Sequence, residues 1–196
     1  IWLCGMIGTT SQAANQIALS LASLTFMFAM GLSVTAMIRI GNQKGLNDYV
    51  TLRKVAISIF LLAIVIEIVF ALLFVALHTT LPYIFVDIND VTNLTENLEV
   101  IAISANLLLV AAVFQISDGL QVVVLGALRG LQDAKIPMYI TFVAYWVIGF
   151  PISIYLGLET ELKAIGVWIG LLAGLTAAAI FLYIRFNYLT KKLIKN

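Results

Sequence analysis

The 196-residue chain is 62% hydrophobic and only 11% charged, with a net charge of +1 and a mean hydropathy of +1.08. Soluble domains carry about a quarter charged residues, so this composition excludes an ordinary water-soluble domain, and the basic residues form no patch suited to nucleic acid. The apolar stretches are continuous and much longer than the roughly ten-residue alternating segments of a transmembrane β-barrel, so they predict an all-α integral membrane protein.

The first apolar stretch covers residues 1–38 and contains no charged residue. It is too long for a single membrane span of about 20 residues. The polar tetrapeptide at residues 9–12 predicts a division into the end of one helix, at residues 1–8, and a complete helix over about 13–38. No basic segment and no small-residue cleavage site are present, so the stretch does not have the pattern of a signal peptide.

Further apolar runs predict four more complete membrane-spanning helices, over about 55–78, 99–127, 137–157 and 164–184. Pro137 suits the first turn of its helix, where the missing N–H costs nothing. Pro151 falls inside the same helix and is expected to kink it. The sequence therefore predicts five complete transmembrane helices plus the end of a sixth.

Two of these helices carry glycines at every fourth position. Gly126 and Gly130 form one such series, and Gly166, Gly170 and Gly174 form the other. This spacing lets helix backbones approach closely in lipid. We expect packing faces here and assign them no chemistry.

The charged residues between the spans are distributed unequally. Ten of the eleven basic residues fall in the first loop, the third loop and the C-terminal tail: Arg39, Lys44, Arg53, Lys54, Arg129, Lys135, Arg185, Lys191, Lys192 and Lys195. The alternate loops combine one lysine with six carboxylates: Lys163, Asp87, Asp90, Glu96, Glu99, Glu159 and Glu161. The positive-inside rule predicts that the basic side and the C-terminus of this multi-pass protein are cytoplasmic.

Asp118 is the more informative of two carboxylates within the predicted spans, since a charge at the bilayer centre costs at least about 2.5 kcal/mol. Gln115 and Gln121 lie three residues to either side, so they form a polar stripe with Asp118 on one helix face. Phe114 lies one turn earlier on the same side. Such a stripe could bind Na⁺ or a proton, or face a cationic organic substrate; a packing role through a hydrogen bond to a neighbouring helix is the alternative.

Glu67 lies at the middle of the second complete span, with only apolar residues around it. It could be a second proton site, or a protonated carboxyl that serves packing alone. Asn15 and Gln16, near one end of their helix, could line a pathway or cap that helix. The residues alone leave these alternatives open.

The remaining reactive side chains predict no cofactor and no catalytic centre. A single cysteine, Cys4, and a single histidine, His78, give no disulfide and no metal site at a recognisable spacing. The two intramembrane carboxylates lie far apart in the sequence and do not supply the group of residues that an enzyme needs. We therefore expect no enzyme, no cofactor, and no metal beyond a coupling Na⁺ at Asp118.

Several longer strings resemble one known family. The chain is similar to the multidrug and toxin extrusion (MATE) family, in its norfloxacin-exporter-like bacterial branch, at residues 12–20 (QAANQIALS), 31–33 (GLS), 39–41 (RIG), 115–121 (QISDGLQ), 126–130 (GALRG) and 144–149 (AYWVIG). Each string is weak alone, but together they span nearly the whole chain.

The resemblance implies that residues 1–196 are the C-terminal six-helix lobe of a twelve-helix, two-lobe secondary transporter. It implies an antiporter that exports cationic, aromatic drugs and toxins across the bacterial inner membrane in exchange for Na⁺ or H⁺. The N-terminal lobe and membrane lipid are its implied partners. The acidic residue of the family's tenth helix falls on Asp118. Some members have a tyrosine four residues before it, where this sequence has Phe114.

Two other functions remain open at this point. A flippase of the same superfamily for lipid-linked oligosaccharides would show cationic residues in its cavity to bind pyrophosphate, whereas the membrane-centred charges here are acidic. A non-transporting membrane scaffold would have no need of Asp118.

Overall fold

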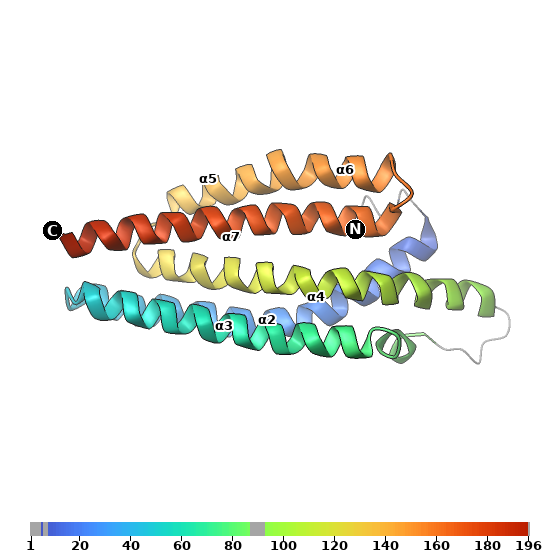
Figure 1. Ribbon diagram of the computed structural model, residues 1–196, viewed down its shortest axis with the longest axis horizontal. Helices are drawn as coiled ribbons and strands as arrows, with labels where there is room; N and C mark the ends of the chain where they lie inside the picture. The colour runs from blue at the N-terminus through green and yellow to red at the C-terminus, as the bar shows by residue number, and fades with distance from the viewer. Residues whose placement is uncertain (1–4, 6–7, 87–92, 196) are drawn as a thin grey trace.

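A computed structural model describes residues 5, 8–86 and 93–195, which are helical throughout their regular segments and contain no strand. The helices run along a common long axis (Figure 1). In chain order they are α2 (Thr9–Gly45), α3 (Tyr49–Leu77), the short 3₁₀ helix η1 (Leu81–Ile84), α4 (Leu94–Gly130), α5 (Lys135–Val143), the π-helical η2 (Ala144–Gly149), α6 (Phe150–Leu158) and α7 (Lys163–Lys195). The all-α prediction is confirmed.

Among the described residues, five helical passes are long and apolar enough to cross a membrane: α2, α3, α4, α7 and the continuous pass Lys135–Leu158. Each corresponds to one of the five predicted spans, so these predictions are confirmed. Most of the passes are longer than predicted, because polar residues continue the helices past the apolar runs. The predicted C-terminal tail after residue 184 is helical to Lys195, and only residues 46–48 separate α2 from α3.

The predicted start of the first complete helix, at about residue 13, is wrong, because α2 begins at Thr9. The tetrapeptide at residues 9–12 is the first turn of α2 and does not precede it; the backbone N–H of Gln12 already donates to the Gly8 carbonyl at 3.0 Å. Short polar side chains suit a first turn, where backbone N–H groups lack helical partners. The predicted end of a sixth helix, at residues 1–8, lies outside the described residues except for Gly5 and Gly8, as does Cys4.

The disturbance expected at Pro151 takes the form of a π-helical segment. The backbone N–H of Phe150 donates to the carbonyl of Tyr145, five residues back, at the end of η2. Pro151 has no N–H, so the α-helical pattern resumes only after this wider turn. Pro137 lies in the first turn of α5, as predicted.

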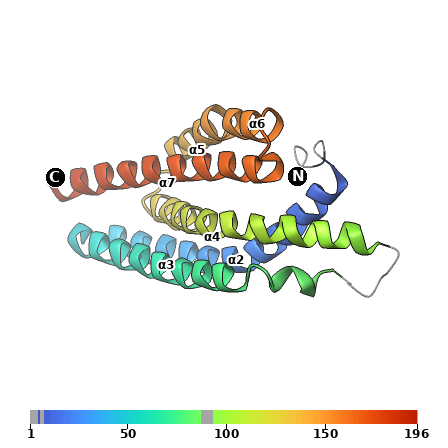
Figure 2. The same cartoon turned by 45° about the vertical axis from the view of Figure 1, so that its right-hand side comes forward.

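Helix α4 is central to the bundle. It packs against α2, α3 and α7, while the pass formed by α5, η2 and α6 packs chiefly against α7 (Figures 1 and 2). The predicted glycine faces lie at two of these contacts. A side chain at Gly126 or Gly130 would collide with the α2 backbone at Ser33 or Met37.

The second glycine series faces the α5–α6 pass in the same way. A Cβ atom at Gly166 would meet the carbonyl of Leu156, and one at Gly170 would meet Ser153. Gly174 lies against the backbone of Gly149 in η2. Both packing predictions are confirmed, because a Cβ atom at each of these glycines would press against a neighbouring helix.

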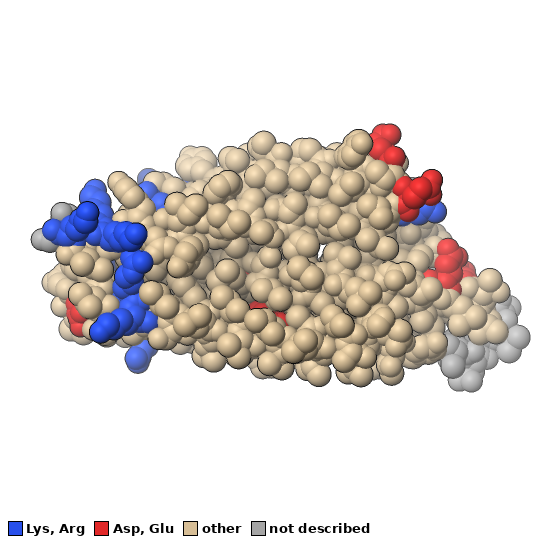
Figure 3. Space-filling view, viewed as in Figure 1, with Lys and Arg blue, Asp and Glu red and all other residues tan. Residues whose placement is uncertain are grey.

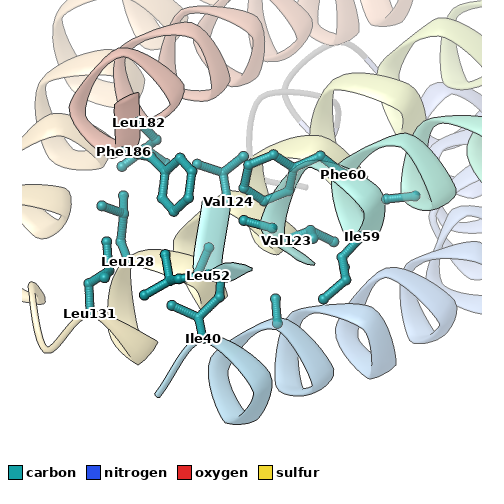
Figure 4. Packing of buried hydrophobic residues seen from close by; sticks show 14 residues of the cluster. Ile40, Leu52, Ile59, Phe60, Val123, Val124, Leu128, Leu131, Leu182 and Phe186 are labelled. Carbon is teal, nitrogen blue, oxygen red and sulfur yellow. The ribbon is translucent and has the colours of Figure 1, made fainter. Parts of the chain in front are cut away.

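In the described part of the chain the apolar core forms two clusters, each built from α2, α3, α4 and α7. The cluster nearer the C-terminal end includes Ile40, Leu52, Leu128 and Phe186 (Figure 4). The other contains Leu21, Phe74, Leu108 and Trp168. Along α3 the clusters stop at Ala63 and resume at Phe74, and along α4 they stop at Ala112 and resume at Val123. The structure therefore leaves an interval between them near the middle of the bundle.

Charged side chains gather at the two ends of the bundle (Figure 3). Lysines and arginines of α2, α3, α4, α5 and α7 lie at the end that holds the C-terminus, and carboxylates with Lys163 lie at the other end. Asp87 and Asp90, which the sequence also assigned to the acidic end, lie outside the described residues.

Candidate functional site

The interval between the two apolar clusters holds both intramembrane carboxylates. Glu67 reaches it from α3 with 2% of its surface exposed, and Asp118, partly buried, reaches it from α4. Both line one cavity, together with Thr25 of α2. The sequence interpretation treated the two carboxylates as distant; the packing of α3 on α4 brings them to the same site.

The cavity is small and enclosed by three helices. The volume open to the centre of a water molecule is about 10 Å³. That is close to the minimum needed for one water molecule. Its wall is formed by Ala22, Thr25, Phe26, Glu67, Phe114, Gln115, Asp118 and Gly119. A single small polar guest is the largest that this space admits.

Several buried polar atoms at this cavity have no hydrogen-bond partner among the described residues. They are Oε2 of Glu67 and both amide atoms, Oε1 and Nε2, of Gln115, whose side chain is only 3% exposed. Leaving a buried polar atom unpaired costs about 1–3 kcal/mol. Two side chains of one cavity, Glu67 and Gln115, therefore carry unpaired buried atoms. Unpaired atoms of this kind are expected where a bound ion or water molecule supplies the missing partner.

The chemistry of these groups suits a hard cation or a proton carrier. A carboxylate oxygen of Glu67, the amide oxygen of Gln115 and the carboxylate of Asp118 are all oxygen donors, the type that hard cations prefer. In the part of the chain that the structure describes, no three His, Cys, Asp or Glu side chains are grouped so that they could hold a metal ion. Oxygen donors of this kind suit Na⁺ or H⁺.

Gly119 is a site residue that the sequence interpretation missed. A Cβ atom at Gly119 would lie 2.7 Å from both Cγ and Oε1 of Glu67. The absence of a side chain therefore lets the Glu67 carboxyl lie directly against the α4 backbone, next to Asp118. The sequence did offer one signal: Gly119 directly follows the intramembrane Asp118 and belongs to neither of the glycine series with four-residue spacing.

Phe114 forms the aromatic side of the site. Its ring packs against Trp168 of α7 with the centroids 5.1 Å apart and the planes tilted by 55°. The indole Nε1 of Trp168 donates to Oδ1 of Asn15 at 3.0 Å, while Nδ2 of Asn15 is buried without a partner. The structure thus connects Phe114 through Trp168 to α2, and Asn15 does not cap its helix.

Gln121 lies apart from the cavity. Its side chain is 5% exposed, and its Oε1 accepts a 2.6 Å hydrogen bond from the hydroxyl of Tyr145 in η2. The predicted polar stripe therefore divides: Gln115 and Asp118 line the cavity, while Gln121 joins α4 to the π-helical segment. This contact could not be read from the sequence, because it depends on where the irregular pass meets α4.

Comparisons with known proteins are consistent with each other. The MatE family model matches residues 1–155. The chain is 38% identical over 193 residues to a probable multidrug resistance protein NorM of Agrobacterium fabrum, covering 98% of this chain and 41% of that protein. It is 41% identical over 182 residues to a protein of the same description from Rhodopseudomonas palustris, covering 93% and 37%. The chain spans about two fifths of the length of these curated relatives.

Solved structures show the same fold. An outward-facing multidrug resistance MATE family transporter superposes with a TM-score of 0.86 at 16% identity, covering all of this chain and 43% of the other. The eukaryotic MATE transporter AtDTX14 superposes with a TM-score of 0.79 at 20% identity, covering 92% and 40%. From the family match and this fold, we conclude that the chain is a multi-pass membrane protein of the MatE family.

Proposed function

We propose that the chain is the C-terminal lobe of a cation-coupled antiporter that exports cationic, aromatic drugs and toxins across the bacterial inner membrane. The relatives described as probable multidrug resistance proteins support the transport of drugs. The observation that carries the coupling is the cavity shared by Glu67 and Asp118, with its unpartnered oxygens.

Two carboxylates from different helices give this cavity a way to respond to an ion. A cation or proton bound there neutralises negative charge that would otherwise attract a cationic drug. Binding of the ion and of the drug are then linked, and the linkage acts equally in both directions. Because α3 and α4 each supply one carboxylate, occupancy of the cavity also changes how strongly the two helices hold together.

The aromatic side of the site supports the proposed substrate class. Phe114 lines the cavity and packs on the buried Trp168, so an aromatic ring held in place adjoins the two carboxylates. Aromatic faces attract organic cations, as carboxylates do. Within the described helices the charged residues near mid-bundle are Glu67, which is buried, and Asp118, which is partly buried. Both are acidic, which favours cationic substrates over the pyrophosphate-linked cargo of a flippase.

The charge distribution supports the orientation. Ten of the eleven basic residues fall at the end with the C-terminus, which by the positive-inside rule is the cytoplasmic end. The Glu67–Asp118 cavity then lies at mid-membrane, with the acidic end of the bundle outside.

The test is efflux by the protein that carries this chain, reconstituted in vesicles with defined Na⁺ and pH gradients. Asp118→Asn and Glu67→Gln each preserve shape and remove a charge, and each should abolish or strongly reduce ion-driven export of an organic cation. Glu99→Gln, an exposed carboxylate at the acidic end, is the matched control and should export at the parental rate. Parental export by Asp118→Asn, with unchanged dependence on Na⁺ and pH, would return the site to a packing role.

A further inference from the structure

A basic hollow lies at the C-terminal end of the bundle, far from the carboxylate cavity. Its volume is about 310 Å³, and it lies between the last turn of α2, the loop after α4 and the end of α7. We call it the basic hollow; its wall includes Lys44, Leu131, Asp133, Arg185, Lys192 and Leu193. Three of these side chains are cationic and one is anionic, so the hollow carries a net positive charge.

Two of the three cations are already held in place. The Lys44 ammonium donates to the carbonyl oxygen of Leu131 at 2.8 Å and to Oε1 of Gln132 at 3.0 Å. Arg185 Nε donates to Oδ2 of Asp133 at 2.9 Å, in a salt bridge. These contacts fix the wall of the hollow, and they leave donor capacity on both side chains, since an ammonium has three N–H groups and a guanidinium five.

Lys192 differs from these two. Its side chain is exposed, and it makes no hydrogen bond or ion pair with any other described residue. It also lines a second hollow of about 360 Å³, formed with Tyr188, Lys191 and Lys195. Lys192 therefore lies where two basic surfaces meet, and its charge is uncompensated.

The face of α7 that leads to Lys192 changes in polarity along its length. Phe181, Ile184 and Tyr188 are exposed at helical spacing, and Lys191, Lys192 and Lys195 follow on the same side. The apolar run of this helix ends near residue 184, so Lys192 lies about 12 Å farther along the axis at 1.5 Å per residue. That distance places it in the headgroup region, with Tyr188 at the boundary where tyrosines concentrate.

We propose that the basic hollow binds the phosphodiester headgroup of an anionic phospholipid, with the lipid's acyl chains along the exposed apolar face of α7. Along α7 the exposed surface changes from apolar to aromatic to cationic. A lipid molecule changes in the matching order, from its apolar acyl chains to its anionic phosphate. Basic pockets between transmembrane helices at headgroup depth bind such lipids by charge. A leucine floor, Leu131, Leu189 and Leu193, suits a lipid better than a freely soluble anion.

This site is independent of the proposed transport. It requires only that the basic end lies at a membrane surface, and it uses no residue of the carboxylate cavity. A loss of export with intact lipid binding, or the reverse, therefore separates the two proposals.

The experiment measures lipid binding to the purified, detergent-solubilised protein that carries this chain, by native mass spectrometry. Phosphatidylglycerol should bind at least tenfold more tightly than phosphatidylcholine, and inorganic phosphate should not displace it. Lys192→Gln should weaken phosphatidylglycerol binding about fivefold, the effect of one lysine near an anionic lipid surface. Lys192→Arg should retain it, because the charge is kept.

Lys54→Gln is the matched control, because Lys54 is an exposed lysine at the same end of the bundle that does not line the hollow. It should bind phosphatidylglycerol as the parent does. Equal losses in Lys54→Gln and Lys192→Gln would overturn the proposal in favour of a diffuse surface charge, and displacement by inorganic phosphate would make it a free-anion site. If Lys192→Gln is unstable, Lys44→Gln supplies the same test, because Lys44 also lines the hollow.

Discussion

Gly119→Ala is the substitution that most directly tests the geometry of the carboxylate cavity. The added Cβ would lie 2.7 Å from Cγ and Oε1 of Glu67, well inside van der Waals contact, and the opposing atoms are 98% buried. Inserting one methyl group into such a site typically costs about 1–3 kcal/mol. For a chain of this size that corresponds to a fall in Tm of roughly 2–12 °C. Export should also fall, because Glu67 has to leave its place beside Asp118.

Gly31→Ala supplies the control, because Gly31 is also helical but has no heavy atom within 4 Å of the position that a Cβ would take. An alanine in an open helical position gains roughly 0.5–1 kcal/mol over glycine, so this variant should melt at or slightly above the parental temperature. The same Gly→Ala change should thus lower Tm at residue 119 and leave it unchanged or slightly raised at residue 31.

A double-mutant cycle assigns the cost of Gly119→Ala to Glu67. Glu67→Ala removes the atoms that the new methyl group meets, so Gly119→Ala should cost little in that background. Thermal unfolding of the four purified proteins in detergent gives the coupling. Two results would refute the placement of Glu67 against α4. One is a Tm change for Gly119→Ala equal to that for Gly31→Ala, and the other is a fall in Tm for Gly119→Ala that is as large in the Glu67→Ala background as in the parent.

Three further predictions concern the ends of the bundle and the lobe as a whole. Single cysteines at Asn42 and Glu161, in a Cys4→Ser background, should differ in reaction with a membrane-impermeant thiol reagent: only the one at Glu161 should label from outside, and labelling at Asn42 alone would invert the orientation. This chain expressed without additional sequence should give an exporter-deficient strain no drug resistance, since it spans about two fifths of its curated relatives; full resistance would contradict a two-lobe mechanism. The Asp48 carboxyl accepts hydrogen bonds from the side-chain hydroxyl and the backbone N–H of Thr51 at the start of α3, and these two bonds lower its pKa from 3.8. Its cap should therefore stabilise α3 at neutral pH and be lost as pH falls through that lowered pKa, so Asp48→Ala should lower Tm at pH 7 and make a smaller difference near pH 3; an equal difference at both pH values would exclude the charged cap.

Hydropathy was sufficient to predict the five passes, because each apolar run needs a membrane or a core to cover it. The ends of the passes were not predictable on that basis. Helices α4 and α7 continue through polar residues, to Gly130 and Lys195, where hydrogen bonding and neighbouring helices maintain the helix in the absence of apolar periodicity. Hydropathy measures the part of a helix inside the hydrocarbon and says nothing of its extensions.

The site shows a different limit. Gln115 and Asp118 share a helix face by spacing alone, so their proximity could be predicted. The approach of Glu67 depends on the register of α3 against α4, which Gly119 and its neighbours determine in three dimensions. The same holds for Gln121: its partner Tyr145 lies in a π-helical segment that sequence spacing does not reveal.

The dependence of the α5–α6 pass on α7 has a consequence for how the protein is made. That pass packs chiefly against the glycine face of α7, and residues 159–162 alone connect the two. A ribosome completes the pass before Gly166, Gly170 and Gly174 have been synthesised. The nascent pass, with its proline-interrupted hydrogen bonding, therefore enters the bilayer without its partner. The helices described here can pack together only when α7 folds back as the second arm of a hairpin.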